Sequence, residues 1–316
     1  MNLFDLHCDT IYECYFKGER LRKNNLSLSL CKGRAIKKWC QCFALFIHDK
    51  FKGEDATSMY YTLLRTLKSE LASNLDLAVL CRTGEQIDEA TAEGKCAAIL
   101  TVENLSMLNG DIDMVYIMWC DGVRMATLTW NSDNCVASGV NGTSGLTAFG
   151  KEVVKKFNEL GIICDVSHLN EQSFWEVLEL SEAPVVASHS NLSSVHKQIR
   201  NLTDEQFKAV CQTGGLVGIN FYNEFLGGAP LDSIYRHLDR ALELGGENNI
   251  AIGTDYDGAQ VDFPINSVDK IGILCDYLLD RGVSQNVLDK LFYENALRLF
   301  RKEELHCITT AQETNQ

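Results

Sequence analysis

The chain opens with a cluster of side chains suited to metal binding. Asp5, His7 and Asp9 stand two positions apart near the N-terminus. Side chains two apart on a β-strand share a face, so a strand from Phe4 to Thr10 predicts one imidazole and two carboxylates side by side. Burying such groups is costly without compensation, which a metal ion at the strand end would supply. The simpler interpretation is that His7 and Asp9 only hydrogen-bond to each other near the surface.

Length and composition are typical of one globular α/β barrel domain. The 316 residues are 46% hydrophobic and 23% charged, and such a barrel usually has roughly 250 residues plus loop insertions. No apolar stretch approaches the ~20 residues of a membrane span, and the N-terminus has no charged-then-apolar leader. We therefore expect a cytoplasmic protein without a membrane partner.

Charge and cysteine usage exclude several classes of function. The net charge is −14, which disfavours a nucleic acid or an anionic membrane as partner. The 13 cysteines are odd in number and irregularly spaced. A disulfide framework or a zinc ribbon is therefore not expected.

Short apolar runs alternate with stretches of helical periodicity along the whole chain. The eight predicted strands are Phe4–Thr10, Trp39–Ile47, Cys96–Glu103, Val123–Trp130, Ile162–His168, Pro184–His189, Leu216–Tyr222 and Ile250–Asp255. No shift in composition marks a boundary, and near-continuous apolar runs are typical of parallel strands covered by helices. The pattern predicts a single (β/α)8 TIM barrel over residues 1–316, with a short polar tail from about residue 305.

Histidines and acids gather at the C-terminal ends of these runs. They are His7, Asp9, Glu103, His168, His189 and Asp255. In this fold the strand ends converge on one mouth, where active sites are built. Nitrogen and oxygen ligands suit Zn²⁺, with Mn²⁺, Co²⁺ or Fe²⁺ as alternatives.

The number of candidate ligands indicates two metal ions instead of one. Five exceed what a single catalytic zinc uses, whereas two ions sharing a carboxylate would use all five. Glu103, on a strand between the others, is the natural bridge, which leaves Asp255 to move a proton. Such a centre would hydrolyse its substrate with a hydroxide that bridges the two ions.

Several motifs are distributed along nearly the whole chain. They are D-L-H-C-D-T (5–10), T-V-E-N (101–104), L-T-W-N (128–131), G-L-T-A-F-G-K-E-V-V (145–154), L-G-I-I-C-D-V-S-H (160–168), P-V-V-A-S-H-S-N (184–191), I-R-N-L-T-D-E-Q (199–206), G-L-V-G-I-N-F-Y (215–222) and I-G-T-D-Y-D-G (252–258). Together these motifs resemble those of the membrane (renal) dipeptidase family, dinuclear zinc enzymes on a (β/α)8 barrel.

The resemblance implies a division of the ligands between two zinc ions. His7 and Asp9 would bind one ion and His168 and His189 the other, with Glu103 bridging them. The implied substrate is a small dipeptide, in many family members one with a D-residue at its C-terminal position. Family members often form homodimers, although the sequence shows no interface signature.

Two further residues receive roles through the resemblance. Asp255 would lie near the nucleophilic water, and Arg200 matches the family arginine that binds the substrate's terminal carboxylate. A guanidinium is suited to that task because it offers two parallel hydrogen bonds.

Three positions depart from the family pattern. The better-known animal members have a histidine at the position of Trp130, which is thought to steady the oxyanion; tryptophan offers only an indole N–H. Asn104 follows Glu103 where a glycine pair is common. Phe225 stands where a carboxylate-binding tyrosine is expected, with Tyr222 nearby. These four residues leave substrate scope less defined than reaction class.

The other histidines carry weaker expectations. His48 ends the second predicted strand at the same rim and is a candidate for lining the pocket. His196 and His237 lie in helical stretches and His306 in the tail, where surface or packing roles are expected.

Two other functions fit part of the sequence. One is an amidohydrolase-type barrel acting on a cyclic amide or ester, but that superfamily usually begins with His-x-His and bridges through a lysine after the fourth strand. Here the second ligand is Asp9, and the fourth strand ends in Trp130. The other is a non-catalytic barrel that keeps its metals and binds peptides, suggested by the missing histidine.

Overall fold

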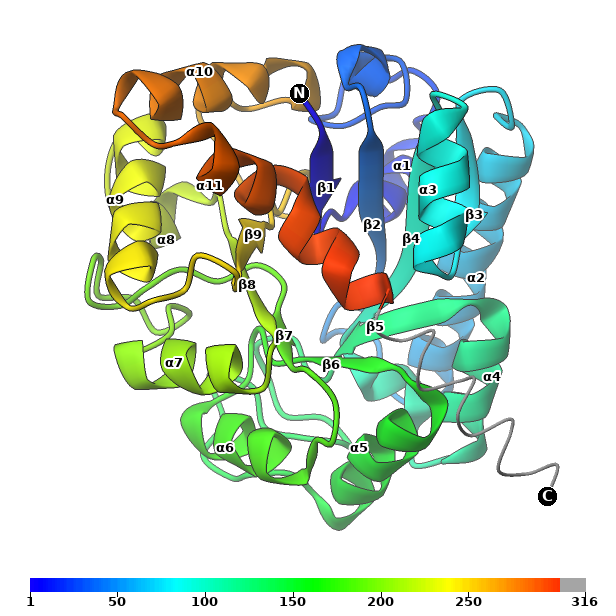
Figure 1. Cartoon of the computed structure of the whole chain (residues 1–316). Helices are drawn as coiled ribbons and strands as arrows, with labels where there is room; N and C mark the ends of the chain where they lie inside the picture. Colours follow the sequence, from blue (N-terminus) through cyan, green and yellow to red (C-terminus); the bar gives the residue numbers. More distant parts are fainter. Residues whose placement is uncertain (302–316) are drawn as a thin grey trace, which may run out of the picture.

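A parallel β-sheet closes into a barrel in the computed structural model, which describes residues 1–301. The strands follow the order β2-β1-β9-β8-β7-β6-β5-β4, and pairing of β2 with β4 closes the ring (Figure 1). Their bounds are β1 (Leu3–Asp5), β2 (Trp39–Phe46), β4 (Cys96–Glu103), β5 (Val123–Thr127), β6 (Ile163–Asp165), β7 (Val186–Ala187), β8 (Leu216–Ile219) and β9 (Ile250–Ile252). The predicted (β/α)8 fold is confirmed; the predicted tail from about residue 305 lies outside the described residues.

An additional strand, β3 (Ala78–Cys81), lies beside the barrel wall and was not predicted. It pairs with the first half of β4, from Ala78↔Cys96 to Cys81↔Ile99, whereas β5 pairs with the second half of β4 from Leu100 onwards. Four residues are too few for a periodic pattern to distinguish a strand from a loop. The helix α3 (Gly84–Ala92) that follows β3 was also not predicted.

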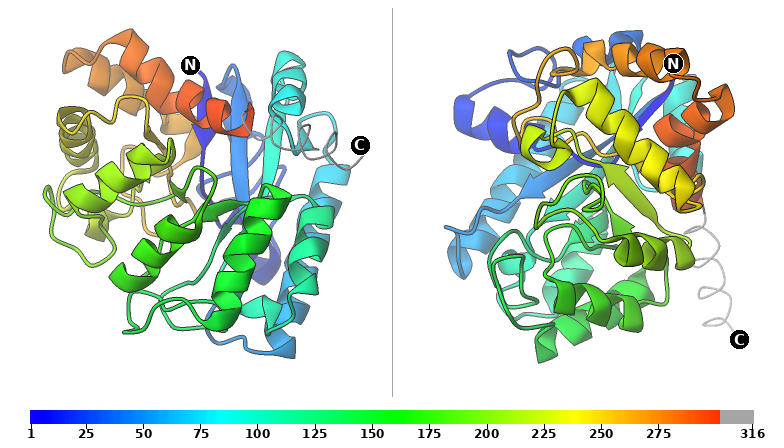
Figure 2. Two further views of the ribbon diagram at one scale, coloured as in Figure 1. Left: turned by 60° about the horizontal axis from the view of Figure 1, so that its bottom comes forward. Right: turned by 90° about the vertical axis from the view of Figure 1, so that its left-hand side faces the viewer.

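Helices cover the outside of the barrel (Figure 2). Their bounds are α1 (Thr10–Lys17), α2 (Glu54–Ala72), α4 (Asp113–Asp121), α5 (Ala148–Leu160), α6 (Glu171–Leu180), α7 (Asp204–Gln212), α8 (Asn223–Leu226), α9 (Pro230–Glu243), α10 (Gly272–Asp280) and α11 (Gln285–Asp289), with the short helical turns η1 (Lys32–Ala35), η2 (Leu105–Leu108), η3 (Val268–Lys270) and η4 (Lys290–Glu294). None of the helices within residues 1–301 is long and apolar enough to span a bilayer.

Two apolar cores stabilise this arrangement. One lies between the strands and the helices, and the other fills the barrel and its N-terminal end. At that end Phe4 of β1 stacks on Phe300, with ring centroids 5.3 Å apart. The helical segment 290–301 therefore seals the bottom of the barrel, and only the opposite mouth is left for chemistry.

The first strand is shorter than predicted. Its pairing with β2 stops at Asp5↔Gln41, and α1 already begins at Thr10. The reason is local: the Asp5 carboxylate accepts a hydrogen bond from the backbone N–H of His7 at 3.4 Å, which bends the chain out of the strand. His7 and Asp9 consequently lie in the loop above the strand, at the barrel mouth.

Candidate metal centre

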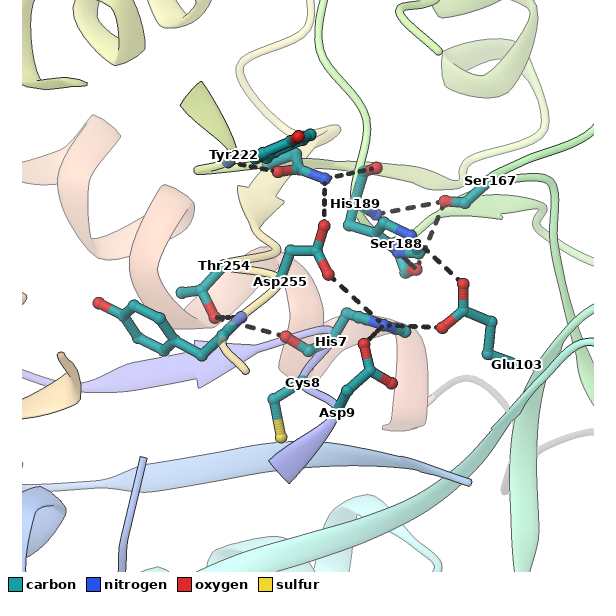
Figure 3. A network of polar contacts seen from close by, with 12 residues as sticks. His7, Cys8, Asp9, Glu103, Ser167, Ser188, His189, Tyr222, Thr254 and Asp255 are labelled. Carbon is teal, nitrogen blue, oxygen red and sulfur yellow. Dashed lines mark hydrogen bonds and ion pairs between the residues drawn. The ribbon is translucent and has the colours of Figure 1, made fainter. Parts of the chain in front are cut away.

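Imidazoles and carboxylates from separate strand ends meet at the C-terminal mouth of the barrel (Figure 3). One oxygen of Glu103, Oε2, lies 3.3 Å from His7 Nε2, which is itself 3.3 Å from Asp9 Oδ2. The other oxygen, Oε1, lies 2.9 Å from His168 Nε2 and 4.0 Å from His189 Nε2. Glu103 therefore faces the His7–Asp9 pair with one oxygen and the His168–His189 pair with the other.

The donor set fits metal binding. Three overlapping groups of buried side chains bring their ligand atoms within 4.8 Å of one another: His7–Asp9–Glu103, Glu103–His168–His189 and His7–His189–Asp255. The second carboxylate oxygen of Asp9, Oδ1, is buried without a hydrogen-bond partner. Unpartnered buried carboxylate oxygens are costly, and a divalent ion would satisfy this one.

Hydrogen bonds orient the two histidines after β6 and β7. His168 Nδ1 lies 2.9 Å from Asn131 Oδ1, and His189 Nδ1 lies 2.7 Å from Ser188 Oγ. Since the Ser188 hydroxyl donates to Asp165 Oδ2 at 2.5 Å, it accepts from His189 Nδ1–H. Both Nε2 atoms then present lone pairs to the same space, 2.8 Å apart. Metal-binding histidines are oriented in this way.

Burial and neighbouring charges shift the pKa values of the residues in this cluster. It lowers the pKa of His168 and of His189 well below the ordinary value, which keeps both imidazoles neutral as ligands must be. Burial and the neighbouring Asp9 raise the pKa of Glu103 to about 8. Burial also opposes a charge on His7, but Asp9 and Glu103 outweigh it and raise the pKa of that imidazole well above its usual range. A bound divalent cation would counteract the raised pKa values of Glu103 and His7, because it favours the deprotonated form of both groups.

Asp255 lies at the edge of the cluster. Its Oδ1 is 4.0 Å from His7 Nε2, and its Oδ2 accepts a hydrogen bond of 2.9 Å from the side-chain amide of Asn220. Burial raises the pKa of Asp255 to about 6. A carboxyl group with a pKa near the working pH is suited to accept and return a proton.

Arg200 is buried close to the cluster, and no carboxylate among residues 1–301 pairs with it. It is 6% exposed and its guanidinium lies 5.5 Å from the centroid of the Phe225 ring. Its Nη2 donates a long hydrogen bond of 3.4 Å to the His189 carbonyl, and Nε has no partner. Burial lowers the pKa of Arg200 to about 10, so the group stays cationic at neutral pH. A buried cation with spare donors fits the recognition of a carboxylate.

A cavity of about 350 Å³ lies over the cluster. It is lined by Asp9, Phe46, Glu103, Trp130, Asn131, His168, Tyr222, Phe225, Asp255, Gly258, Ala259 and Gln260. The structure thus brings the predicted Trp130, Tyr222 and Phe225 to the same cavity as the candidate ligands. Arg200 instead lines a separate cavity of about 970 Å³.

Several positioning residues were missed by the sequence analysis. Asn131, Ser188 and Asn220 hydrogen-bond to candidate site residues, and a Cβ atom at Gly258 would collide with the carboxylate oxygens of Asp9 and Asp255. Ser188 and Asn131 stand next to singled-out residues in S-H-S and L-T-W-N. Their hydrogen-bonding side chains were the available signal.

Two departures from the family pattern have a structural account. Asn104 adopts a positive φ of 74°, a conformation glycine prefers, and its amide donates to the Ile47 carbonyl at 2.6 Å. It therefore occupies this turn without glycine. Trp130 lies beside His168 with ring centroids 6.5 Å apart, so an indole takes up space next to the candidate ligands.

The remaining histidines separate into three cases. His48 packs against Trp130 with ring centroids 4.9 Å apart and does not line the cavity itself. His237 is buried between the loops after β7 and β8, in keeping with a packing role. His196 is half-buried, and His306 lies outside the described residues.

Comparison with known proteins relates the whole chain to one group of enzymes. A family model for membrane dipeptidase (peptidase family M19) matches residues 1–313. A Klebsiella pneumoniae protein known as the uncharacterized protein in the pqqA 5′ region is 33% identical over 262 residues, which cover 78% of this chain and 97% of the relative.

Solved structures share the fold. The dipeptidase AC, a metallopeptidase of family M19, superimposes with a TM-score of 0.91 at 25% identity, covering 96% of this chain and 98% of that one. A metallopeptidase from Rhodobacter sphaeroides, liganded with a phosphinate mimic of the dipeptide L-Ala-D-Ala, gives a TM-score of 0.89 at 24% identity, covering 95% and 98%.

Proposed function

The chain belongs to the membrane dipeptidase family, peptidase family M19, and is a metallo-dipeptidase; from this premise we propose which residues carry the reaction and which dipeptides it takes. The substrates are small dipeptides, including those with a C-terminal D-residue, because the Rhodobacter sphaeroides relative binds a mimic of L-Ala-D-Ala. The location proposed is the cytoplasm, since the described cysteines are unpaired thiols.

The placement of Glu103 carries the proposal of two metal sites. Its two oxygens face different histidines, His7 and His168, at 3.3 and 2.9 Å. We assign one divalent ion to His7, Asp9 and Glu103 and the other to Glu103, His168 and His189. Zn²⁺ suits this nitrogen and oxygen donor set, with Mn²⁺ or Co²⁺ as alternatives. When bound, the two ions activate a water molecule and polarise the scissile carbonyl.

The protein's own groups handle the proton and the substrate ends. Asp255 accepts the proton of the attacking water and returns it to the leaving amine, since its carboxylate lies at the edge of the ligand cluster, with Oδ1 4.0 Å from His7 Nε2. Arg200 holds the substrate α-carboxylate through its unpartnered donors. Trp130 offers only an indole N–H as a donor to the oxyanion, at the position where the better-known animal members have a histidine.

Hydrolysis of dipeptides tests this assignment. Purified protein supplied with Zn²⁺ or Mn²⁺ is expected to cleave L,L- and L,D-dipeptides, and a chelator is expected to abolish the activity. Cleavage of cyclic amides or esters in place of dipeptides would favour the amidohydrolase-type alternative. Binding of dipeptides with two metal equivalents but without turnover would favour the non-catalytic alternative. The predicted homodimer is checked separately by the molar mass in solution.

A further inference from the structure

The cavity above the candidate metal centre has two aromatic sides. Phe46 and Trp130 line one of them, and Tyr222 and Phe225 line the other. In the ring of strands, Phe46 ends β2 and Trp130 follows β5, on either side of β4, which carries Glu103. Tyr222 and Phe225 follow β8, the strand opposite β4 in this ring. The two aromatic pairs therefore face each other across the candidate ligands.

Arg200 does not line this cavity itself, but its contact with Phe225, which does, gives the cavity a direction. Its guanidinium lies over the Phe225 ring, and Phe225 packs on Tyr222 with ring centroids 4.8 Å apart. If Arg200 holds the α-carboxylate, as the proposed function requires, the C-terminal residue of a dipeptide occupies the β8 side. The scissile carbonyl then lies over Glu103 and its partners, and the N-terminal residue extends towards Phe46 and Trp130.

The surface that would receive the N-terminal residue is formed by aromatic rings that pack on further rings. Phe46 meets Trp130 edge to face, with ring centroids 5.2 Å apart and an interplanar angle of 68°. Trp130 also packs on His48, and Phe46 packs on Tyr12 at 5.1 Å. Rings that already pack on neighbouring rings lose little freedom when a ligand binds.

Among the described residues that line the cavity, those on this side outside the ligand cluster are the uncharged Phe46, Trp130 and Asn131. Lys50 and Asp49 lie near His48 and do not line the cavity. Among the described residues that line the cavity, the acids are Asp9, Glu103 and Asp255, all of them in the ligand cluster. Burial and the nearby Lys50 lower the pKa of His48, so the ring behind Trp130 is neutral at pH 7. An acidic side chain placed here would be desolvated without a partner, whereas an apolar one would be stabilised.

We propose that Phe46 and Trp130 form the binding surface for the side chain of the dipeptide's N-terminal residue and select large apolar or aromatic residues there. The inference rests on the proposed function and names the substrate class of the same site. It also gives Trp130 a role in this chain, because its ring would select the N-terminal side chain of the substrate through apolar contact. Apolar contacts of this kind change kcat/KM by about 10- to 200-fold for each methylene by which two substrates differ.

The test is the ratio of kcat/KM for Phe-Ala over Gly-Ala, with Leu-Ala, Ala-Ala and Glu-Ala completing the panel. The unmodified enzyme is expected to prefer Phe-Ala and Leu-Ala by about tenfold or more, with Glu-Ala the poorest substrate. Trp130→Ala should bring the ratio close to one, and Trp130→Phe should restore much of it. Phe46→Ala provides a second variant on the same surface in case Trp130→Ala does not fold.

Two controls separate the possible outcomes. Tyr15→Ala removes an exposed aromatic ring that does not line the cavity, and Phe225→Ala removes one on the opposite side; both should keep the ratio. Equal cleavage of Phe-Ala and Gly-Ala by the unmodified enzyme would overturn the inference and leave the proposed function intact. Loss of the ratio in Phe225→Ala instead of Trp130→Ala would also overturn it. If no dipeptide is cleaved, the proposed function and the inference both fail.

Discussion

Replacing Arg200 by alanine should remove the preference for a free substrate carboxylate. Arg200 is 6% exposed; within the described part of the chain its Nε has no partner, and its guanidinium makes a single hydrogen bond, which is long at 3.4 Å. A substrate carboxylate would therefore accept hydrogen bonds from donors that lack a partner, and it would have to break only one long hydrogen bond. Hydrogen bonds to a charged group contribute roughly 1.5–3 kcal/mol, which corresponds to about 10- to 150-fold in kcat/KM at 1.4 kcal/mol per decade.

The assay compares a dipeptide with its C-terminal amide and with the matching tripeptide. The amide and the tripeptide place a neutral group where the carboxylate should lie, so the unmodified enzyme should prefer the dipeptide by at least the factor above. In Arg200→Ala the preference should shrink, because dipeptide cleavage falls while amide cleavage changes little. Arg200→Lys keeps the charge without the planar fork and should retain part of it. Arg22→Ala, which removes an exposed arginine paired with Asp76, is the matched control and should change neither rate.

Equal cleavage of a dipeptide and its amide by the unmodified enzyme would refute the reasoning. The role of Arg200 and the restriction to dipeptides would then both be wrong. Hydrolysis of a cyclic amide or ester would become the leading interpretation, because such substrates carry no α-carboxylate.

Glu103, Asp255 and His237 support three more predictions. Glu103→Ala should lose most of two bound metal ions per chain in elemental analysis, and retention of both would exclude a shared carboxylate. Asp255→Asn should keep most of the metal but lower kcat by about 10²- to 10⁴-fold; near-normal turnover would remove Asp255 from the mechanism. Burial lowers the pKa of His237 to about 4, so between pH 6.5 and 4 the unfolded chain takes up a proton that the folded chain does not. As the pH is lowered through this range, the free energy of unfolding should fall by up to about 3 kcal/mol. In His237→Gln, the free energy of unfolding measured by urea titration should lack this part of its pH dependence.

The sequence predicted the barrel and its mouth because both depend on patterns that the fold repeats. Most of the apolar runs end in or next to a polar side chain, and the ends of parallel strands meet at one edge. Glu103 illustrates this: it is the last residue of β4 in the structure and the last residue of a predicted strand. The assignment needed no knowledge of which strands are neighbours.

Features that depend on tertiary contacts could not be predicted. β3 is a four-residue strand whose pairing exists only because β4 is long enough to take β3 along one half and β5 along the other. The orientation of His168 likewise depends on a positive φ of 68° and on Asn131, which comes from a different loop. The pairing of β3 has no signature in the local sequence, and Asn131 was visible there only as a polar neighbour of Trp130.

Several strands end in the same kind of side-chain-to-backbone turn, which helps to place the site residues at the mouth of the barrel. A polar side chain accepts a hydrogen bond from the backbone N–H two residues further on and turns the chain out of the strand. It occurs at Asp5 with His7, Asn104 with Ser106, Asp165 with Ser167, Asn220 with Tyr222 and Thr254 with Tyr256. Every candidate ligand except His189 lies within four residues of one of these turns, and His189 is held through Ser188, whose hydroxyl and backbone N–H both donate to Asp165.

A polar residue at the end of an apolar run is therefore itself a signal: it ends the strand early and raises the following side chains into the mouth. Read in this way, D-L-H and D-V-S-H predict loops and not continued strands, and the error at Phe4–Thr10 follows from treating Asp5 as one more alternating residue of a strand.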